Sequence, residues 1–315
     1  MNNSKSLVGN DPSARIAQLR AGSRRELAAC VTDLERLSPA ASGLLGAMQP
    51  HLGAALVIGI TGPPGAGKST LVNAVVQTAR AQHRRVAVIA VDPSSPISGG
   101  AILGDRIRMT AAHDDDGVYV RSLSSGGYLG GLSPAAVRVI DAIDAAGFDL
   151  ILLETVGAGQ SEVDVAEVAD VRVVVSAPGL GDDIQAMKSG LLEIADILVV
   201  NKGDREGADR TMHQLMAAVS VRATTGDVPV LKTTATSNEG VAALLEAIDD
   251  IGRTVVATGI VARRRRRARY LIARAAADYV TERIRAGGND AYDLLADDVL
   301  AGRVSPSDAA KRALK

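Results

Sequence analysis

Short apolar runs alternate with amphipathic, alanine-rich stretches through the middle of the chain. The runs cover residues 56–60, 86–91, 118–120, 150–153, 171–175, 197–200 and 228–231. Most of them are continuously apolar, which is typical of strands that helices bury on both faces. Because strand and helix alternate, the connections between strands are crossovers. We therefore predict an α/β fold with a doubly wound, mostly parallel sheet.

The two ends of the chain have a helical pattern instead. Between residues 12 and 51, apolar side chains recur at spacings of three and four, which predicts two or three helices. After about residue 255 the pattern predicts one long helix over residues 262–285 and two shorter helices within residues 288–315, the last beginning near Ser305. We expect an N-terminal helical extension (residues 1–50), a central α/β domain (51–257) and a C-terminal helical arm (258–315).

Composition narrows the classes of function. The formal net charge of −1 gives the chain no strong attraction to nucleic acid or to an anionic membrane, and an aromatic content of 2% offers few platforms for stacking bases. The single cysteine, Cys30, cannot form a disulfide within the chain, which fits a cytoplasmic location. The first residues lack the apolar core of a signal peptide, and no apolar stretch approaches the ~20 residues of a membrane span.

An arginine-rich segment falls within the predicted long helix. Residues 263–269 hold six arginines. We favour a solvated, basic helix face over a contact surface for an acidic partner or a second subunit. Nucleic-acid binding is the weakest interpretation, because nothing else in the chain supports it.

The first motif that carries chemistry is Gly62-Pro-Pro-Gly-Ala-Gly-Lys-Ser69, which matches the P-loop pattern G-x-x-x-x-G-K-[ST]. Glycines let backbone N–H groups turn toward phosphate oxygens, and a helix that begins near Lys68 adds its N-terminal dipole. The ammonium group of Lys68 can neutralise β- and γ-phosphates, and the hydroxyl of Ser69 can bind Mg²⁺. The predicted phosphate-binding residues are Gly62, Pro63, Pro64, Gly65, Ala66, Gly67, Lys68, Ser69 and Thr70.

The second motif, Asn201-Lys202-Gly203-Asp204, follows directly after an apolar run. The two carboxylate oxygens of Asp204 match the adjacent N1–H and N2–H donors of guanine, which adenine lacks, so we predict GTP rather than ATP. Asn201 can contact the other edge of the base, and the stem of Lys202 can lie over its ring. Thr234 and Ala235 stand where a last base-contacting loop belongs.

Three acidic residues complete the predicted site. Asp92 and Glu154 each follow an apolar run, and Asp105 lies in the loop after Asp92. Because ligands collect at the carboxyl ends of strands in such sheets, these acids and Ser69 are candidate Mg²⁺ ligands, and Lys68, Asp92 and Glu154 are the candidate catalytic residues. Any one of the acids could instead be a helix N-cap.

Two glycine-rich segments, residues 124–131 and 177–190, are interpreted either as plain flexible connections or as switches beside a γ-phosphate. The second segment contains Asp182, Gln185 and Lys188, which share a face if the segment is helical. The sequence identifies no catalytic base. Gln160, in the segment after Glu154, is the one glutamine placed where a residue that orients the attacking water could lie. The four histidines are scattered without the spacing of a metal site.

Several long strings resemble the MeaB/ArgK GTPases, which belong to a broader group of P-loop GTPases that act as metallochaperones. They are GITGPPGAGKSTLVNA, VDPSSPISGGAILGDRIRM, LGGLS, ETVGAGQSEVDVAEVAD and the NKGD box. The resemblance spans roughly residues 10–315. It implies a GTPase with slow intrinsic turnover and a homodimer joined by the C-terminal arm. The implied role is that of a chaperone that gates adenosylcobalamin loading and protects an acyl-CoA mutase, chiefly methylmalonyl-CoA mutase.

The resemblance also implies roles for particular residues. Asp92, Asp105 and Glu154 match magnesium and switch acids, and the NKGD box matches the base-specificity box. Asp182, Gln185 and Lys188 match a switch that responds to the mutase.

Three alternatives stay open: a nickel-type metallochaperone GTPase, an ATP-dependent kinase associated with transport, and a scaffold with a degenerate nucleotide site. The first would need a histidine-rich or cysteine-containing metal site, and the NKGD box argues against the ATP specificity of the second. The intact lysine, serine and acids argue against the third.

Overall fold

The computed structural model describes residues 11–92, 115–124, 132, 134–155, 165, 167–179, 190–220, 228–286 and 290–313. The chain divides into two compact units, Met1–Arg267 and Ala268–Lys315. The first unit contains the sheet and the helices that cover it. The predicted boundaries at residues 50 and 257 stay predictions.

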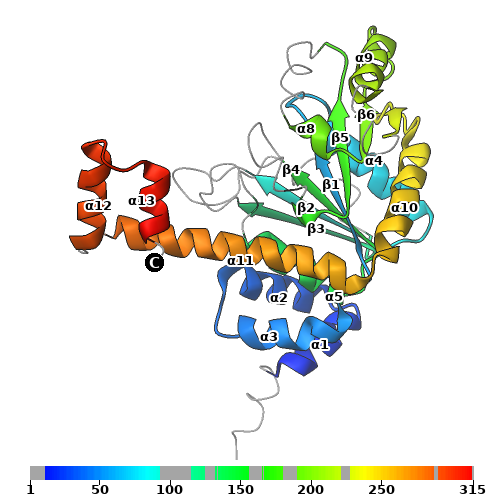
Figure 1. Cartoon of the computed structure of the whole chain (residues 1–315). Helices are drawn as coiled ribbons and strands as arrows, with labels where there is room; N and C mark the ends of the chain where they lie inside the picture. The colour runs from blue at the N-terminus through cyan, green and yellow to red at the C-terminus, as the bar shows by residue number, and fades with distance from the viewer. Residues whose placement is uncertain are drawn as a thin grey trace, which may run out of the picture. The chain divides into compact units, whose positions relative to one another are not determined.

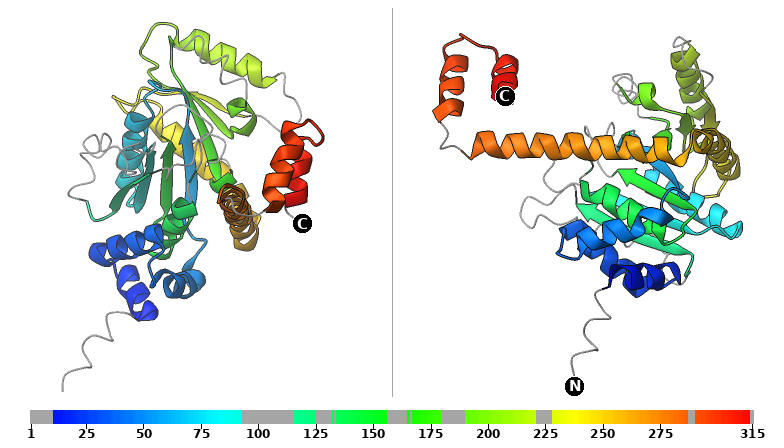
Figure 2. Two further views of the ribbon diagram at one scale, coloured as in Figure 1. Left: turned by 90° about the vertical axis from the view of Figure 1, so that its left-hand side faces the viewer. Right: turned by 60° about the horizontal axis from the view of Figure 1, so that its bottom comes forward.

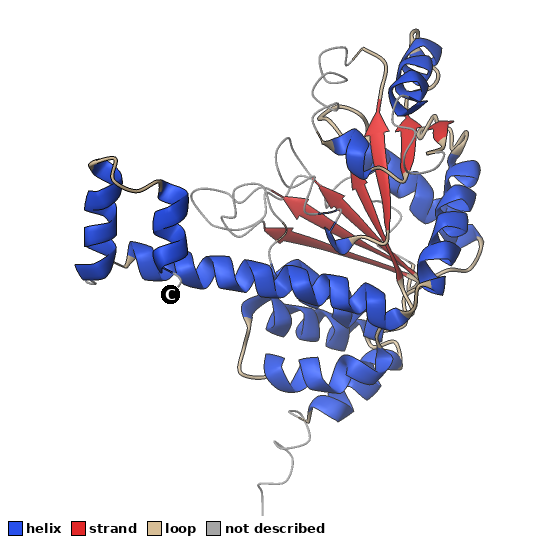
Figure 3. Cartoon of the chain, in the orientation of Figure 1, coloured by secondary structure: helices blue, strands red, loops and turns tan. Residues whose placement is uncertain are grey.

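In the described part of the chain, seven strands form one sheet in the order β3-β2-β4-β1-β5-β6-β7. Figure 3 shows the strands in red with the helices around them in blue. The pairings between neighbouring strands are parallel, which confirms the predicted fold class. The strands are β1 (Leu56–Thr61), β2 (Val86–Asp92), β3 (Val118–Ser124), β4 (Leu150–Thr155), β5 (Val171–Ser176), β6 (Ile197–Val200) and β7 (Val230–Lys232). Each predicted run overlaps a strand, although β7 begins only after Pro229, which has no N–H for the ladder.

The strand order places a topological switch point at β1. The chain first builds β2, β3 and β4 on one side of β1 and then β5, β6 and β7 on the other. In open α/β sheets, ligands bind outside the carboxyl ends of the strands at such a point. The carboxyl ends of β1, β4, β5 and β6 therefore mark the expected site (Figure 1).

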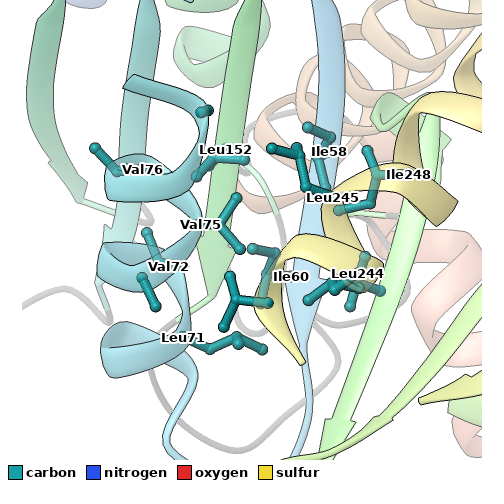
Figure 4. Packing of buried hydrophobic residues seen from close by; sticks show 14 of the residues in the cluster. Ile58, Ile60, Leu71, Val72, Val75, Val76, Leu152, Leu244, Leu245 and Ile248 are labelled. Carbon is teal, nitrogen blue, oxygen red and sulfur yellow. The ribbon is translucent and has the colours of Figure 1, made fainter. Parts of the chain in front are cut away.

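Helices α4 (Lys68–Ala81) and α10 (Val241–Ala257) cover one face of the sheet. Val75 of α4 packs near Leu152 and Ile60, and Leu244 and Ile248 of α10 close the other side of this core (Figure 4). These side chains are fully buried. Burial of each such side chain contributes about 1.5–3 kcal/mol, so this aliphatic layer is a main source of stability despite the scarcity of aromatic residues.

The opposite face is covered by helices from several parts of the chain. Helix α5 (Pro134–Ala145) packs against β4 and against α2 (Arg24–Arg36), which itself packs with α1 (Pro12–Arg20) and α3 (Ala41–Met48); a 3-10 turn, η1 (Gln49–His51), follows α3 (Figure 2). Helices α8 (Leu191–Ile194) and α9 (Ala208–Ser220) pack with the outward side chains of β5 and β6. The N-terminal pattern thus forms three α-helices.

Side-chain caps explain where several helices begin. Asp11 accepts hydrogen bonds from the N–H groups of residues 13 and 14 at the start of α1, and Ser23 caps α2 in the same way. At the start of α13 (Pro306–Ala313), Ser305 Oγ accepts a hydrogen bond from Asp308 N and donates one to the carboxylate of Asp308. The start predicted near Ser305 is confirmed.

The second unit contains the rest of α11 (Ile260–Arg285), together with α12 (Asp290–Leu300) and α13. The predicted long helix followed by two short ones is therefore confirmed. The large apolar side chains that this unit exposes are Ile272, Tyr279, Ile284, Leu294 and Leu300. Among the described helices of the whole chain, none is long and apolar enough to cross a membrane.

Three of the six clustered arginines lie against one carboxylate, that of Asp170, instead of forming a solvated face. Arg263 Nη2 and Arg267 Nη2 donate to Asp170 Oδ2 at 2.6 and 2.7 Å, and Arg266 Nη2 lies 3.3 Å from Oδ1. Arg263 and Arg267 are buried. The preferred interpretation of the run is therefore wrong for these residues. Positions three and four apart share a helix face, and the sequence does not reveal that Asp170 lies opposite that face.

Residues 53–55, directly before β1, are bound by the side chains of Asp144 and Arg263. The carboxylate of Asp144 accepts hydrogen bonds from the N–H groups of Gly53, Ala54 and Ala55 at 2.5, 3.1 and 2.9 Å. Arg263 donates to the carbonyl oxygens of Gly53 and Ala55 at 3.1 and 2.6 Å. Because the backbone polar groups of this turn are bound in this way, the start of the central strand has a fixed position.

Asp141, one turn before Asp144 on α5, has an unfavourable environment. Burial raises its pKa to about 6, against the attraction of Arg267, and the charge of Asp144 adds to the rise. The pKa of Asp141 is higher in the folded than in the unfolded protein. The charged carboxylate therefore lowers the stability fully at a pH above the folded pKa, and this loss disappears as the pH falls to the unfolded pKa.

We therefore expect Asp141→Asn to stabilise the protein by about 1–3 kcal/mol near neutral pH, with a smaller gain near about pH 4. Thermal unfolding at both pH values measures the effect. Asp144→Asn on the same helix is the matched control and should destabilise, because an amide keeps only one of the two oxygens that accept from three backbone N–H groups and places an NH2 donor where the other stood. A gain for Asp141→Asn that does not depend on pH would contradict the assignment.

Candidate nucleotide-binding site

The P-loop motif lies between the carboxyl end of β1 and the first turn of α4, as the sequence predicts. Gly62 has a φ of +140°, and a Cβ there would stand 2.0 Å from Val175 O of the neighbouring strand. Gly67 has a φ of +86°, and a Cβ there would stand 2.6 Å from Asn201 Nδ2. Both positions therefore require glycine, and α4 begins at Lys68 with its N-terminus toward the loop.

Two lysines lie on the carbonyl groups of this loop. Lys68 Nζ donates to Gly62 O at 2.6 Å and to Pro63 O at 3.1 Å, and the residue is 7% exposed. Lys202 Nζ, from the NKGD box, donates to Gly65 O at 2.6 Å. The loop thus carries two ammonium groups, and Lys68 is where the sequence predicts the phosphate-binding lysine.

Asn201 connects two loops of the site. Its Nδ2 donates to Ala66 O at 3.0 Å and to Gly67 O at 3.3 Å, and its Oδ1 accepts from Thr233 Oγ1 and Ala235 N, both at 3.2 Å. An amide side chain has two donor hydrogens and two acceptor lone pairs, and these contacts use all of them. Asn201 therefore joins the P-loop to the loop after β7. Its predicted contact with the base stays a prediction.

Asp204 is the last residue of the NKGD turn, and its side chain is exposed. Lys202 holds a left-handed φ of +57°, and Gly203 N donates to Thr233 O at 2.9 Å. A Cβ on Gly203 would stand 2.8 Å from Lys232 Cγ, so the turn has no room for a side chain. Thr234 lies in the same loop, where its N–H donates to the carbonyl oxygen of residue 239.

This arrangement leads to a prediction for base specificity. Asp204→Asn should lower the affinity for GTP by about 10²- to 10⁴-fold, because guanine N2–H loses its acceptor and faces an amide donor. The same variant should gain affinity for xanthosine triphosphate. Competition against a fluorescent guanine nucleotide measures both changes, and Asp209→Asn is the control, an exposed aspartate paired with Lys232. Unchanged discrimination between the two bases would count against the assignment.

The candidate Mg²⁺ ligands are only partly described by the structure. Ser69 Oγ donates to Glu154 Oε1 at 2.6 Å, and Glu154 is fully buried at the end of β4. Asp92 ends β2, but its side chain lies outside the described residues, as does the whole of Asp105. A hydroxyl and a carboxylate are hard oxygen donors of the kind Mg²⁺ prefers, so the described pair fits the ion. Among the described residues there is no group of three or more histidine, cysteine or acidic side chains that could hold a metal.

Several predicted residues cannot be placed. Asp182, Gln185, Lys188 and Gln160 lie outside the described residues, as do most of the two glycine-rich segments. The residue that sequence reasoning missed in the base site is Thr233, which is 1% exposed and binds Asn201. Its position directly after a strand, at the carboxyl edge of the sheet, is the signal that could have identified it.

A P-loop at the switch point of a parallel sheet, joined through Asn201 to an NKGD turn, defines a P-loop GTPase. Comparison with known proteins gives the family. A model described as "Methylmalonyl Co-A mutase-associated GTPase MeaB" matches residues 27–289, so the chain belongs to that family. This confirms the resemblance found in the sequence.

Relatives agree with this assignment. A protein from Pyrococcus horikoshii whose name calls it a GTPase is 46% identical over 256 residues, covering 80% of this chain and 81% of that protein. GTPase ArgK from Escherichia coli is 44% identical over 193 residues, covering 60% of this chain and 58% of that protein. The mouse (Mus musculus) protein named methylmalonic aciduria type A homolog, mitochondrial, is 33% identical over 267 residues, covering 82% of this chain and 64% of that protein. The chain is thus a GTPase by family and by site.

Solved structures share the fold. The crystal structure of an LAO/AO transport system kinase has a TM-score of 0.75 and 28% identity, covering 99% of this chain and 98% of that one. HypB from Helicobacter pylori, solved in complex with nickel, has a TM-score of 0.51 at 14% identity, covering 73% of this chain and 96% of that one, and it shows the fold alone.

Proposed function

We propose that this GTPase is a nucleotide-gated chaperone that controls adenosylcobalamin loading of an acyl-CoA mutase and protects it, with methylmalonyl-CoA mutase as the first candidate partner. The observation that carries the proposal is an intact nucleotide site within a family described by its association with that mutase. The name of the mouse relative points to the same metabolism. The kinase alternative has only the name of one solved structure behind it, and the nickel alternative has only a likeness of fold.

The residues of the site have different roles in the binding and hydrolysis of GTP. Asp204 selects guanine, while Asn201 holds the P-loop at a fixed position relative to the base loop. Lys68 exchanges its contacts with two loop carbonyls for the β- and γ-phosphates, where it offsets negative charge as the γ-phosphoryl group leaves. Ser69 and Glu154, with Asp92 and Asp105, would hold Mg²⁺, which supplies further charge neutralisation.

We also propose a homodimer formed through the C-terminal arm and a cytoplasmic location. The exposed apolar side chains of the second unit, defined above, support self-association, because monomers rarely expose many such groups on a small unit. The single cysteine is consistent with a reducing compartment. Asp182, Gln185 and Lys188 remain the proposed residues that respond to the mutase.

The test is GTP hydrolysis by the purified protein with and without a stoichiometric amount of methylmalonyl-CoA mutase from the same source. We expect slow turnover alone, a several-fold rise with the mutase, and no hydrolysis of ATP in the control. A GTPase rate that the mutase does not change would overturn the choice of partner. A preference for ATP would overturn the nucleotide assignment.

A further inference from the structure

Two buried threonines meet at the ends of the two strands that carry the P-loop and Glu154. Thr61 is the last residue of β1 and Thr155 the last residue of β4, and each is 1% exposed. Thr155 Oγ1 donates a hydrogen bond to Thr61 Oγ1 at 3.3 Å. The rest of β1 is aliphatic or glycine, and β4 is aliphatic up to Glu154, so these hydroxyls stand apart from the composition of both strands.

Valine would suit a buried strand position at least as well. It has nearly the same shape as threonine and a high preference for strands, and it avoids the cost of burying a hydroxyl. The two hydroxyls therefore need a reason beyond packing. The Thr155 hydroxyl finds its acceptor in Thr61, and the pair occurs where the ladder between the strands ends, one residue beyond the pairing of Ile60 with Glu154.

The pair also lies between two parts of the nucleotide site. Thr155 directly follows Glu154, whose Oε1 accepts from Ser69 Oγ at 2.6 Å. Thr61 directly precedes Gly62, whose carbonyl oxygen binds Lys68 and whose Cα lies against β5. Side chains alternate between faces along a strand, so Glu154 and Thr155 point to opposite faces of the sheet. The hydroxyl pair thus connects the two strand ends on one face while Glu154 meets Ser69 on the other.

We propose that Thr61 and Thr155 are positioning residues for the metal–nucleotide complex. Their hydrogen bond fixes the end of β4 relative to the start of the P-loop, and so sets the separation between the Glu154 carboxylate and the Ser69 hydroxyl. The inference rests on Mg²⁺–guanine nucleotide binding in the proposed function and is independent of the mutase partner.

The experiment measures the release of a fluorescent GDP analogue at a series of free Mg²⁺ concentrations. Thr155→Val and Thr61→Val should each raise the Mg²⁺ concentration for half-maximal nucleotide retention by about 2- to 10-fold, the range expected for one hydrogen bond. Thr155→Ser keeps the hydroxyl and should behave like the wild type. The double valine variant should show no more than the larger single effect, because both changes break the same bond.

Controls separate positioning from a general loss of structure. Thr211→Val replaces a buried threonine of α9, outside the P-loop and the ends of β1 and β4, and should leave the Mg²⁺ dependence unchanged. Nucleotide affinity measured with excess chelator should be the same for wild type and valine variants, and thermal unfolding reports whether each variant is folded. Equal effects of Thr155→Ser and Thr155→Val, or single effects that multiply in the double variant, would overturn the proposal. A wild type whose nucleotide retention ignores Mg²⁺ would instead overturn the metal assignment itself.

Discussion

Asp170→Asn should destabilise the protein by about 3–5 kcal/mol, the cost typical of removing one partner of a buried ion pair. The side chain of Asp170 is fully buried and receives Arg263, Arg266 and Arg267 together with the N–H of Val57 at 3.0 Å. Loss of its charge leaves two buried guanidinium groups without their anion. Burial alone would raise the pKa of Asp170, but hydrogen bonds from Arg263 and the charges of Arg263 and Arg267 lower it below its ordinary value.

Urea unfolding near neutral pH measures this effect. The control is Asp249→Asn, which weakens the partly exposed pair of Asp249 with Arg84 and should cost less than about 1 kcal/mol. Because the folded pKa of Asp170 lies below the unfolded one, its stabilising contribution is complete above the unfolded pKa. That contribution is lost as the pH falls through the folded pKa. The difference in stability between the wild type and Asp170→Asn should therefore shrink in acid. If Asp170→Asn and Asp249→Asn were equally stable at neutral pH, Asp170 would not be the anchor of the arginines at the start of α11.

The structural features that can be predicted from the sequence are those set by residues close to one another in the chain. Continuous apolar runs correspond to strands because a parallel sheet buries both faces, and the caps at Ser23 and Ser305 act on N–H groups within three residues. The P-loop can be recognised for the same reason: its glycines and Lys68 lie within eight residues of one another. These features require no knowledge of the tertiary contacts.

The features that the sequence does not predict join distant residues. The arginine run has the pattern of a solvated face, and only Asp170, 93 residues from Arg263, makes it a buried anchor. Asn201 belongs to a base-binding motif, yet its four hydrogen bonds go to residues 66 and 67 and to residues 233 and 235. The hydroxyls of Thr61 and Thr155 lie 94 positions apart in sequence. Residue type gives the bonding capacity of each side chain, but only the fold selects the partner.

Lys68→Ala should lower kcat/KM for GTP by at least about 100-fold, the loss seen when one preorganised donor is removed from a developing negative charge. In this structure the ammonium group lies on the carbonyl oxygens of Gly62 and Pro63, so it is already inside the loop that will surround the phosphates. Little reorganisation is needed to move it to the β- and γ-oxygens, and its charge acts at a nearly dry position because the residue is 7% exposed.

The same variant should keep its fold, since the two carbonyl groups that lose a donor lie in a loop at the sheet edge and not in the aliphatic core. Steady-state hydrolysis of GTP and thermal unfolding, measured on the same preparations, separate the two effects. Lys311→Ala is the matched control, an exposed lysine of α13 paired with Asp308, and it should leave the hydrolysis of GTP unchanged. A folded Lys68→Ala protein that hydrolyses GTP at the normal rate would show that the charge on the transferred phosphoryl group is neutralised elsewhere. The assignment of Lys68 as the phosphate-binding lysine would then fail, and the residue would be left with its contacts to the loop carbonyls of Gly62 and Pro63.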